Sequence, residues 1–306
     1  MAPFSILVSL DGTYDNCELT ATYPGKGRPT AITFINGSVL ACGGQSTNQW
    51  DKCYIFDGSS WSSIPNSNQL HCTYDSQNLV VNKGGWWNMG RLQLSDGSCS
   101  REVTSEIYDG TKWIAGPAHV RDQYSGFACT VNLNSTHSMF IGGDITLSNT
   151  YLYNSITGVW TETGSLNIGR FRHSCVDIEG EGVLALGGYE LGEWNEEKGY
   201  RETIDVFSVE LYNPLTGRWT IQPDMPRDIN PGHPKLFSQV RGVTALFKNE
   251  DTVYKRTQDG EWKVLEGVQL QEPFDGFNMD KAVLVPDSFI TCTKVKNCSL
   301  FHICIK

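Results

Sequence analysis

The sequence predicts an all-β protein built from a repeated four-stranded unit. Two recurring patterns predict it: pairs of adjacent glycines, and an aromatic strand followed by a turn and a tryptophan. The composition agrees, because 31 glycines, 9 tryptophans and 12 tyrosines in 306 residues are typical of many short strands and tight turns. The hydrophobic fraction of 39% is enough for a core, and the charged fraction of 19% is too low for a disordered chain.

The glycine pairs follow short apolar runs, which predict buried strands. These runs read SVLACGG, HSMFIGG and GVLALGG, and a slightly stretched run reads NLVVNKGG. Downstream of the pairs, the segments KCYIFDGSSW, SEIYDGTKW, TYLYNSITGVW and VELYNPLTGRW end at Trp61, Trp113, Trp160 and Trp219. A fifth segment, TVYKRTQDGEW, ends at Trp262 but has no glycine pair upstream. The spacing predicts consecutive copies of one small β unit.

This pattern resembles the kelch repeat, a four-stranded propeller blade of about 50 residues. The resemblance covers nearly the whole chain. It implies that the glycines let the backbone pack tightly beside the central channel and that the tryptophans fill the space between adjacent blades. The expected fold is a single domain over residues 1–306, a six-bladed kelch-type propeller with blades at about 30–65, 68–117, 124–164, 170–223, 233–267 and 278–306.

The ring is expected to close through N- and C-terminal strands that share one blade. Residues 282–294 and 298–306 look like strands of a sixth blade, although they lack the glycine pair and the tryptophan. A closing strand within residues 4–22 then completes that blade, either at 5–10 or at 17–22. Closure of this kind removes the exposed edges that a linear array of sheets would carry.

Aligning the first blade with the sixth predicts two disulfides. Cys42 and Cys292 fall at the same place in the second strand, and Cys53 and Cys304 both fall in the third. Directly opposed cysteines of neighbouring antiparallel strands can be bridged, so we predict the pairs Cys42–Cys53 and Cys292–Cys304. Three further cysteines recur in innermost strands and are expected to be buried thiols that pack as small apolar groups: Cys72, Cys129 and Cys175.

Ten cysteines and three N-glycosylation sequons favour a secreted protein. The sequons begin at Asn36, Asn134 and Asn297. The first residues, MAPFSILVSL, lack a basic region and have a short apolar run, so they are not predicted to be a signal peptide. A cytoplasmic location is the alternative, because intracellular kelch proteins can also be rich in cysteine.

The kelch resemblance implies one binding face, formed by the loops that join second to third strands and blade to blade. From glycine pair to tryptophan there are 17 residues in blades one and three, but 28 in blade two and 31 in blade four. The extra residues predict long loops on a rigid scaffold. Aromatic and arginine side chains there suit protein hot spots or stacking on sugar rings, unless they only cover loops and link blades. The candidate binding residues are Trp50, Trp86, Trp87, Arg91, Arg121, Arg170, Arg172, Trp194 and Arg227.

The composition narrows the class of function. A formal net charge of −10 disfavours nucleic-acid binding, and no apolar run reaches the length of a membrane span. No phosphate-binding glycine loop and no HExxH motif is present, and no cofactor is predicted. We therefore expect a non-enzymatic binding module for a protein or glycan, compatible with a monomer. The alternatives are an enzyme with a metal or acid/base site at the channel mouth, near His71, His173 and His233, and an intracellular kelch adaptor.

Overall fold

The computed structural model is all-β: every regular element in the part of the chain that it describes is a strand. The strands are short and rich in β-branched and aromatic residues, and they alternate with turns that contain Gly, Asn or Asp. The described residues are 6–9, 14–19, 24–25, 31–35, 38–43, 51–69, 77–81, 85–93, 99–117, 127–144, 147–239, 242–248, 252–269, 283–284, 290–294 and 302–305.

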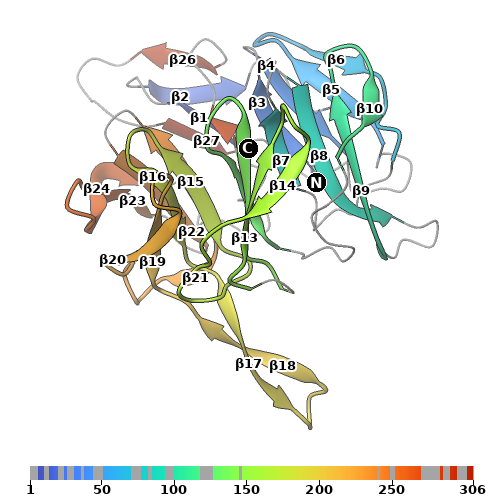
Figure 1. Ribbon diagram of the computed structural model, residues 1–306. Coiled ribbons are helices and arrows are strands. Elements are labelled where there is room, and N and C mark those ends of the chain that lie inside the picture. Colours follow the sequence, from blue (N-terminus) through green and yellow to red (C-terminus); the bar gives the residue numbers. More distant parts are fainter. Residues whose placement is uncertain are drawn as a thin grey trace. The chain divides into compact units, whose positions relative to one another are not determined.

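Five sheets are four-stranded antiparallel meanders, in which sequential strands lie side by side (Figure 1). The first two are β3 (Ala31–Ile35), β4 (Ser38–Cys42), β5 (Cys53–Phe56) and β6 (Trp61–Ile64), then β7 (Gln77–Val81), β8 (Gly85–Gln93), β9 (Cys99–Tyr108) and β10 (Trp113–Ala115). The third is β11 (Cys129–Asn132), β12 (His137–Ile141), β13 (Thr150–Asn154) and β14 (Val159–Glu162).

The fourth sheet is β15 (Ser174–Ile178), β16 (Gly182–Leu186), β19 (Val209–Asn213) and β20 (Arg218–Gln222). Between its two central strands lies a separate hairpin of β17 (Tyr189–Asn195) and β18 (Tyr200–Asp205). The fifth sheet is β21 (Asn230–Gln239), β22 (Gly242–Lys248), β23 (Thr252–Arg256) and β24 (Trp262–Gln269).

Strands from the two ends of the chain pair with each other. β1 (Ile6–Ser9) lies between β25 (Val283–Leu284), to which it is parallel, and β27 (His302–Ile305), to which it is antiparallel. β2 (Tyr14–Leu19) pairs with β26 (Ile290–Lys294). Closure of a six-bladed ring through these strands stays a prediction.

The chain forms two compact units. Residues 1–124 and 281–306 make the first unit, which contains the first two meanders and the paired end strands. Residues 125–280 make the second unit, which contains the other three meanders and the β17–β18 hairpin. The expected single domain over residues 1–306 stays a prediction.

The second glycine pair does not occupy the position that the repeat predicted. Gly85 is the first residue of β8 and pairs with Val81, so it begins the second strand instead of following it. The run NLVV therefore belongs to the first strand, β7. Trp86 and Trp87, expected in a loop, lie within β8, and the extra residues of this repeat lengthen β8 and β9. The apolar run misled the prediction because the first and the second strand of a repeat can both be apolar, and the run itself does not say which of the two it forms.

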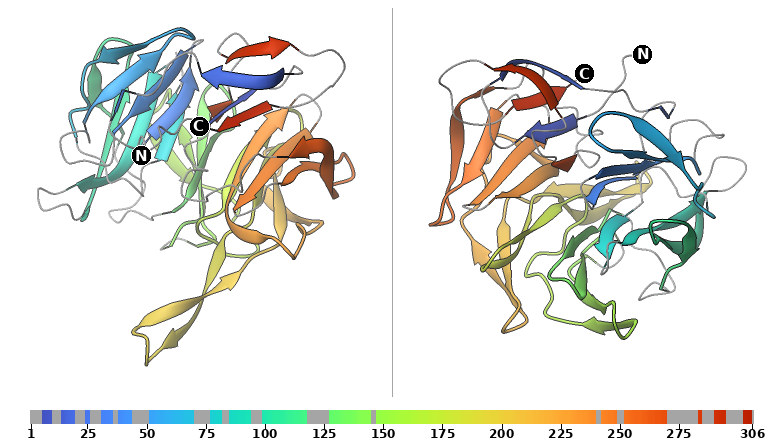
Figure 2. Two further views of the ribbon diagram at one scale, coloured as in Figure 1. Left: turned by 180° about the vertical axis from the view of Figure 1, so that it is seen from behind. Right: turned by 90° about the horizontal axis from the view of Figure 1, so that it is seen from above.

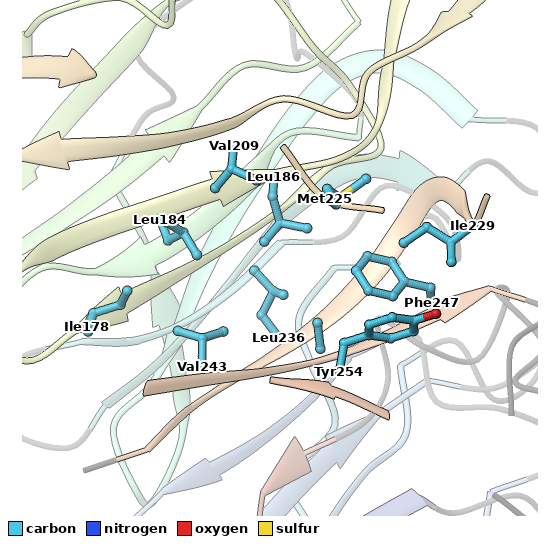
Figure 3. Packing of buried hydrophobic residues seen from close by; sticks show 11 residues of the cluster. Ile178, Leu184, Leu186, Val209, Met225, Ile229, Leu236, Val243, Phe247 and Tyr254 are labelled. Atoms are coloured by element: carbon cyan, nitrogen blue, oxygen red, sulfur yellow. The ribbon is translucent and has the colours of Figure 1, made fainter. Parts of the chain in front are cut away.

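The core of the second unit lies between neighbouring sheets. Figure 3 shows the largest part of it, where Leu184 and Leu186 of β16 face Leu236, Val243 and other residues of the fifth sheet. A second cluster joins the third sheet to the fourth through Met139, Ile141 and Ala185, among others. Burial of these apolar side chains provides the main driving force for stacking of the sheets.

The repeated tryptophans pack on an aromatic side chain of their own sheet and reach toward the preceding sheet. Trp219 lies opposite Tyr212, with ring centroids 5.2 Å apart, and its Nε1–H donates to Thr150 Oγ1 of β13. Trp113 does the same in the first unit, where its Nε1–H donates to the carbonyl of Pro65. Both indoles are 6% exposed, so they fill the space between sheets as the repeat implied.

The glycine pair at the end of β16 is required by close backbone approaches. Gly187 and Gly188 have φ angles of 72° and 84°, in the left-handed region that disfavours other residues. A Cβ on Gly188 would lie 2.4 Å from the carbonyl oxygen of Phe171, and one on Gly187 would lie 2.5 Å from that of Pro231. Any side chain here would therefore push apart the connections that enter the fourth and fifth sheets.

In two of the sheets, a buried glutamate binds the backbone of the connection that leads into that sheet. Glu210 of β19 is fully buried and accepts hydrogen bonds from the backbone N–H of Asn167 and Ile168, at 2.7 and 3.1 Å. Glu106 of β9 accepts in the same way from Asn68 and Gln69, at 2.9 and 3.2 Å. The two glutamates occupy equivalent places in the segments VELY and SEIY. Two of the five repeats therefore include a carboxylate acceptor that the glycine and tryptophan pattern did not reveal.

Arg170 neutralises one of these carboxylates. Its guanidinium has no exposed surface, lies 2.7 Å from Glu210 Oε1 and donates to both the carbonyl and the hydroxyl of Ser208. Burial lowers the pKa of the Arg170 guanidinium, and the charge of Glu210 opposes that effect. The prediction that Arg170 contributes to a binding face is wrong, because this side chain cannot reach a partner.

Two disulfides are present among the described residues. The predicted bond between Cys42 and Cys53 joins β4 to β5 at directly opposed positions, with a Cα–Cα distance of 4.1 Å. Cys129 and Cys175 form the second, between β11 and β15, the first strands of successive sheets, with a Cα–Cα distance of 5.9 Å. The prediction that these two are free thiols is wrong. Each recurs at the same place in its repeat, and stacking brings those places together.

The other predicted disulfide lacks the strand pairing on which it depended. Cys292 and Cys304 were expected on neighbouring strands of one sheet. The strand β26 instead pairs with β2, where Cys292 lies opposite Cys17, and β27 pairs with β1, where Cys304 lies opposite Leu7. Cys72, expected to be a buried thiol, lies outside the described residues.

Removing Glu210 tests the importance of the buried pair. We expect Glu210→Ala to lower the free energy of unfolding by about 3–5 kcal/mol, because the Arg170 guanidinium is left buried without its carboxylate. Urea unfolding followed by tryptophan fluorescence measures the loss. Glu202→Ala is the matched control: it removes an ion pair whose partners are both 52% exposed, and it should unfold like the unchanged protein. Equal unfolding curves for both variants would contradict a stabilising role of the pair.

Candidate functional site

The insertion in the fourth sheet is a β-hairpin that leaves the sheet. β16 and β19 pair directly, with Leu184 opposite Leu211, so the residues between them take no part in that sheet. They were expected to form a loop, but β17 and β18 pair with each other, with a bulge between Leu191 and Trp194. Figure 1 and the left view of Figure 2 show that this hairpin extends away from the sheets of its unit.

Local sequence explains the hairpin. A four-residue turn joins the strands, and Gly199 takes a φ of 68° there. Asn195 closes the turn: its Oδ1 accepts from the backbone N–H of Lys198, and its carbonyl accepts from Gly199. All six residues of β18 are exposed, so the hairpin is supported by its own pairing and not by an underlying core.

The base of the hairpin is anchored to the body of the second unit. Tyr189 and Phe171 exchange two backbone hydrogen bonds of 2.9 Å, and their rings lie 6.0 Å apart. The Tyr189 hydroxyl donates to Asn230 Oδ1 at 3.3 Å. Burial raises the pKa of Tyr189, so this phenol stays protonated as a donor near neutral pH. The hairpin therefore starts from a defined position although its tip is free of other elements.

Three large apolar side chains of the hairpin are exposed. Trp194, Tyr200 and Ile204 have exposed fractions of 53%, 53% and 54%. By the register, Trp194 lies opposite Arg201, whereas Tyr200 and Ile204 alternate with Arg201 and belong to the other face of the ribbon. Exposed apolar side chains of this size on a projecting element are typical of an interaction surface.

The hairpin is acidic, and its two cations are already engaged. Lys198 Nζ lies 3.0 Å from Glu202 Oε1, and the Arg201 guanidinium donates to the carbonyl of Gly192 at 3.1 Å. Near the tip, no ion pair within the described part of the chain involves Glu193, Glu196 or Glu197, and all three are exposed. Residues 189–205 contain six carboxylates and two cations, a formal charge of −6 + 2 = −4. We call these residues the acidic hairpin.

Of the other predicted site residues, Arg172 and Arg227 belong to the second unit. The Arg227 side chain is 74% exposed, pairs with Asp224 and lies over the ring of Phe207 at 5.7 Å. Arg172 is half-buried, with its guanidinium 4.4 Å from the centroid of the Phe127 ring. Trp86, Trp87 and Arg91 lie on β8 of the first unit, and Trp50 and Arg121 lie outside the described residues.

A strained segment surrounds Arg172. Three described non-glycine residues have positive φ angles: Phe127 at 55°, Leu147 at 38° and Arg172 at 54°. They belong to neighbouring connections, because the Arg172 N–H donates to the carbonyl of Phe127 and the Arg170 N–H donates to that of Leu147. Such conformations cost about 1–3 kcal/mol each and persist where packing enforces them. Here they accompany the tight packing of connections around the buried Arg170.

The candidate residues from the sequence include Trp194 but not Tyr200 or Ile204. These two share one face of a strand with Glu202 between them, and this charged residue interrupts the apolar alternation that would have indicated the face. Within the described residues no cluster of three or more His, Cys, Asp or Glu side chains could hold a metal ion. No helix in that part of the chain is long and apolar enough to cross a bilayer.

The comparisons find relatives with kelch repeats. No family model matches the chain. It is 32% identical over 112 residues to Kelch-like protein 24a of Danio rerio, covering 37% of this chain and 17% of that protein. It is 25% identical over 156 residues to human Kelch-like protein 35, covering 51% and 23%. The chain thus spans less than a quarter of the length of these relatives. They support the kelch-repeat resemblance and, with it, a β-propeller.

Two tryptophan variants should show that the acidic hairpin contributes less to stability than the core does. We expect Trp194→Ala to leave the midpoint of thermal unfolding unchanged, because the side chain is 53% exposed and lies toward the exposed end of β17. Trp219→Ala removes an indole that is 6% exposed and should cost about 3–5 kcal/mol. Thermal and urea unfolding followed by circular dichroism measure both. A large loss for Trp194→Ala would instead give this side chain a structural role.

Proposed function

We propose that this chain is a non-enzymatic module that binds a protein partner through the acidic hairpin. The observation that carries the proposal is the exposure of Trp194, Tyr200 and Ile204 on a projecting two-stranded ribbon. Aromatic anchors of this kind contribute most of the binding energy in protein interfaces. The similarity to Kelch-like proteins supports a protein-binding role for the repeat region.

The partner that fits the acidic hairpin has a basic surface with an apolar slot. The formal charge of −4 attracts lysine and arginine side chains, and the exposed carboxylates of Glu193, Glu196 and Glu197 have not been neutralised within the described residues. The indole of Trp194 can add a cation–π contact to such side chains. A glycan is the alternative ligand, because an exposed indole flanked by carboxylates also suits a sugar ring.

The anchored base of the acidic hairpin supports specific binding. Tyr189 is held by Phe171 and Asn230, so the ribbon is presented in one position and loses less freedom on association. The meanders below it contribute a rigid support, since β16 and β19 pair without interruption beside the insertion. Affinity can therefore be changed through the hairpin with little effect on the fold.

We further propose that the module acts outside the cell. The disulfides Cys42–Cys53 and Cys129–Cys175 support this location, because such bonds persist in oxidising compartments. The sequon at Asn134 supports it too, since this asparagine lies in an exposed turn between β11 and β12. Of the other sequons, Asn36 and Asn297 lie outside the described residues.

An intracellular kelch adaptor is the second candidate. The Kelch-like relatives favour it, and this chain matches less than a quarter of their length, so the binding module of a larger protein is also consistent with them. The two candidates differ in the state of the ten cysteines and in glycosylation at the sequons.

A matched pair of isoleucines tests the role of the acidic hairpin. Ile204 and Ile221 are 54% and 52% exposed, both on strands of the second unit, but only Ile204 belongs to the hairpin. The chain is immobilised, its partner is captured from the native fluid and identified, and the affinity of the purified partner is titrated by calorimetry. We expect Ile204→Ala and Trp194→Ala to weaken binding at least tenfold and Ile221→Ala to leave it unchanged.

The salt dependence tests the partner's chemistry separately. Replacing Glu193, Glu196 and Glu197 together with Gln should weaken binding and flatten its dependence on ionic strength. Unchanged affinity in the isoleucine and tryptophan variants would refute the hairpin as the binding surface. Affinity that is lost in those variants but insensitive to salt would keep the hairpin and refute the basic partner.

Intact mass of the protein from its native source tests the location. Folding in an oxidising compartment predicts a mass that rises on reduction by two hydrogens for each disulfide and falls on deglycosylation. Ten free thiols without glycan would assign the chain to an intracellular adaptor.

A further inference from the structure

The strands β2 and β26 join segments from opposite ends of the sequence. They are antiparallel neighbours within the first unit, and both views of Figure 2 draw them near each other in blue and red. Their register places Leu19 opposite Ile290 and Cys17 opposite Cys292, with an irregularity between Tyr14 and Cys17. Two cysteines are thus directly opposed across a pair of strands that are separated in sequence by most of the chain.

Directly opposed positions of an antiparallel pair suit a disulfide. Their Cβ atoms are typically about 4.5–5.5 Å apart, close to the separation that an S–S bond spans. This chain already contains an example, because Cys42 and Cys53 are directly opposed in β4 and β5 and are bonded to each other. The same relation therefore holds at two places in the first unit, and one of them is bridged.

We infer that Cys17 and Cys292 form a disulfide that ties the N-terminal strand β2 to the C-terminal strand β26. This pairing replaces the bond between Cys292 and Cys304, since the register puts Cys304 opposite Leu7 on β1. The inference depends on the register alone and is independent of the proposed hairpin function. The bond links β2 and β26 of the first unit covalently, so these two strands cannot separate while it is intact.

Forming the bond is a two-electron oxidation. The thiols of Cys17 and Cys292 lose two protons and two electrons as the S–S bond forms. The acceptor is the disulfide of a thiol–disulfide oxidoreductase, which is reduced to a dithiol in the exchange. The bond is expected in protein that has folded in an oxidising compartment, together with the two disulfides already described.

Trypsin separates the relevant cysteines, so a non-reducing peptide map tests the inference. The full chain is produced in a secretory pathway, deglycosylated, alkylated without reductant, and digested. Peptide 1–26 contains Cys17 and no other cysteine, peptide 282–294 contains only Cys292, and peptide 297–306 contains Cys298 and Cys304. We expect a linked species with the summed mass of peptides 1–26 and 282–294 less two hydrogens.

Three results would be informative in the same digest. A link between peptides 122–170 and 173–198 reports Cys129–Cys175 and serves as the internal control for oxidation. With that control present, a link between 282–294 and 297–306 would overturn the inference. So would an alkylated, unlinked peptide 282–294.

A set of serine variants tests whether the bond holds the chain ends together. We expect Cys17→Ser, Cys292→Ser and the double variant to lower the midpoint of thermal unfolding by the same amount, about 5–10 °C, because each removes the same bond. Additive losses in the double variant would show that the two cysteines act separately and would overturn the inference.

Discussion

The buried carboxylates on the third strands of the second and fourth sheets are the interaction on which the connections into those two sheets depend. A connection between two meanders cannot join either ladder, so its N–H groups need acceptors when the next sheet covers them. Glu210 and Glu106 supply two oxygens each to such connections, at Asn167 and Ile168 and at Asn68 and Gln69. Without them each N–H would be buried at a cost of about 1–3 kcal/mol. Because a carboxylate in this position is itself expensive to bury, Glu210 is matched by Arg170.

Other contacts reinforce the same neighbouring pair of sheets. The Trp219 indole of β20 donates a hydrogen bond to Thr150 of the third sheet, and the disulfide between Cys129 and Cys175 links the first strands of the third and fourth sheets. The apolar cluster around Met139 and Ala185 lies between those sheets. The packing of the third sheet against the fourth is thus stabilised by the ion pair, the Trp219 indole, the disulfide and the packed aliphatic groups. The hydrogen bonds within each meander could not provide this, because they act along the sheet.

The acidic hairpin is inserted into the fourth sheet without interrupting the pairing of its strands. β16 and β19 keep their register on either side of the insertion, and the chain leaves and re-enters the sheet between Gly188 and Val206, whose N–H donates to the Gly188 carbonyl. All residues of β18 are exposed, and so is Trp194 of β17, so these side chains are free of the packing that constrains the repeat. This separation is the physical basis for assigning binding to the hairpin and stability to the meanders.

The sequence by itself determined the repeat and most strands, because glycine pairs, aromatic strands and tryptophans are local signals. It also predicted Cys42–Cys53, which joins neighbours along the chain, and the exposed Trp194. Only the tertiary structure decided that Arg170 is buried, that Cys129 meets Cys175 and that Cys17 lies opposite Cys292. These contacts join residues on different sheets or at opposite chain ends, and periodicity within one repeat carries no information about which neighbour it stacks on. Gly85 was misplaced for a related reason: the apolar run NLVV does not itself say whether it is the first or the second strand of its sheet, and only the pairing of Val81 with Gly85 decides this.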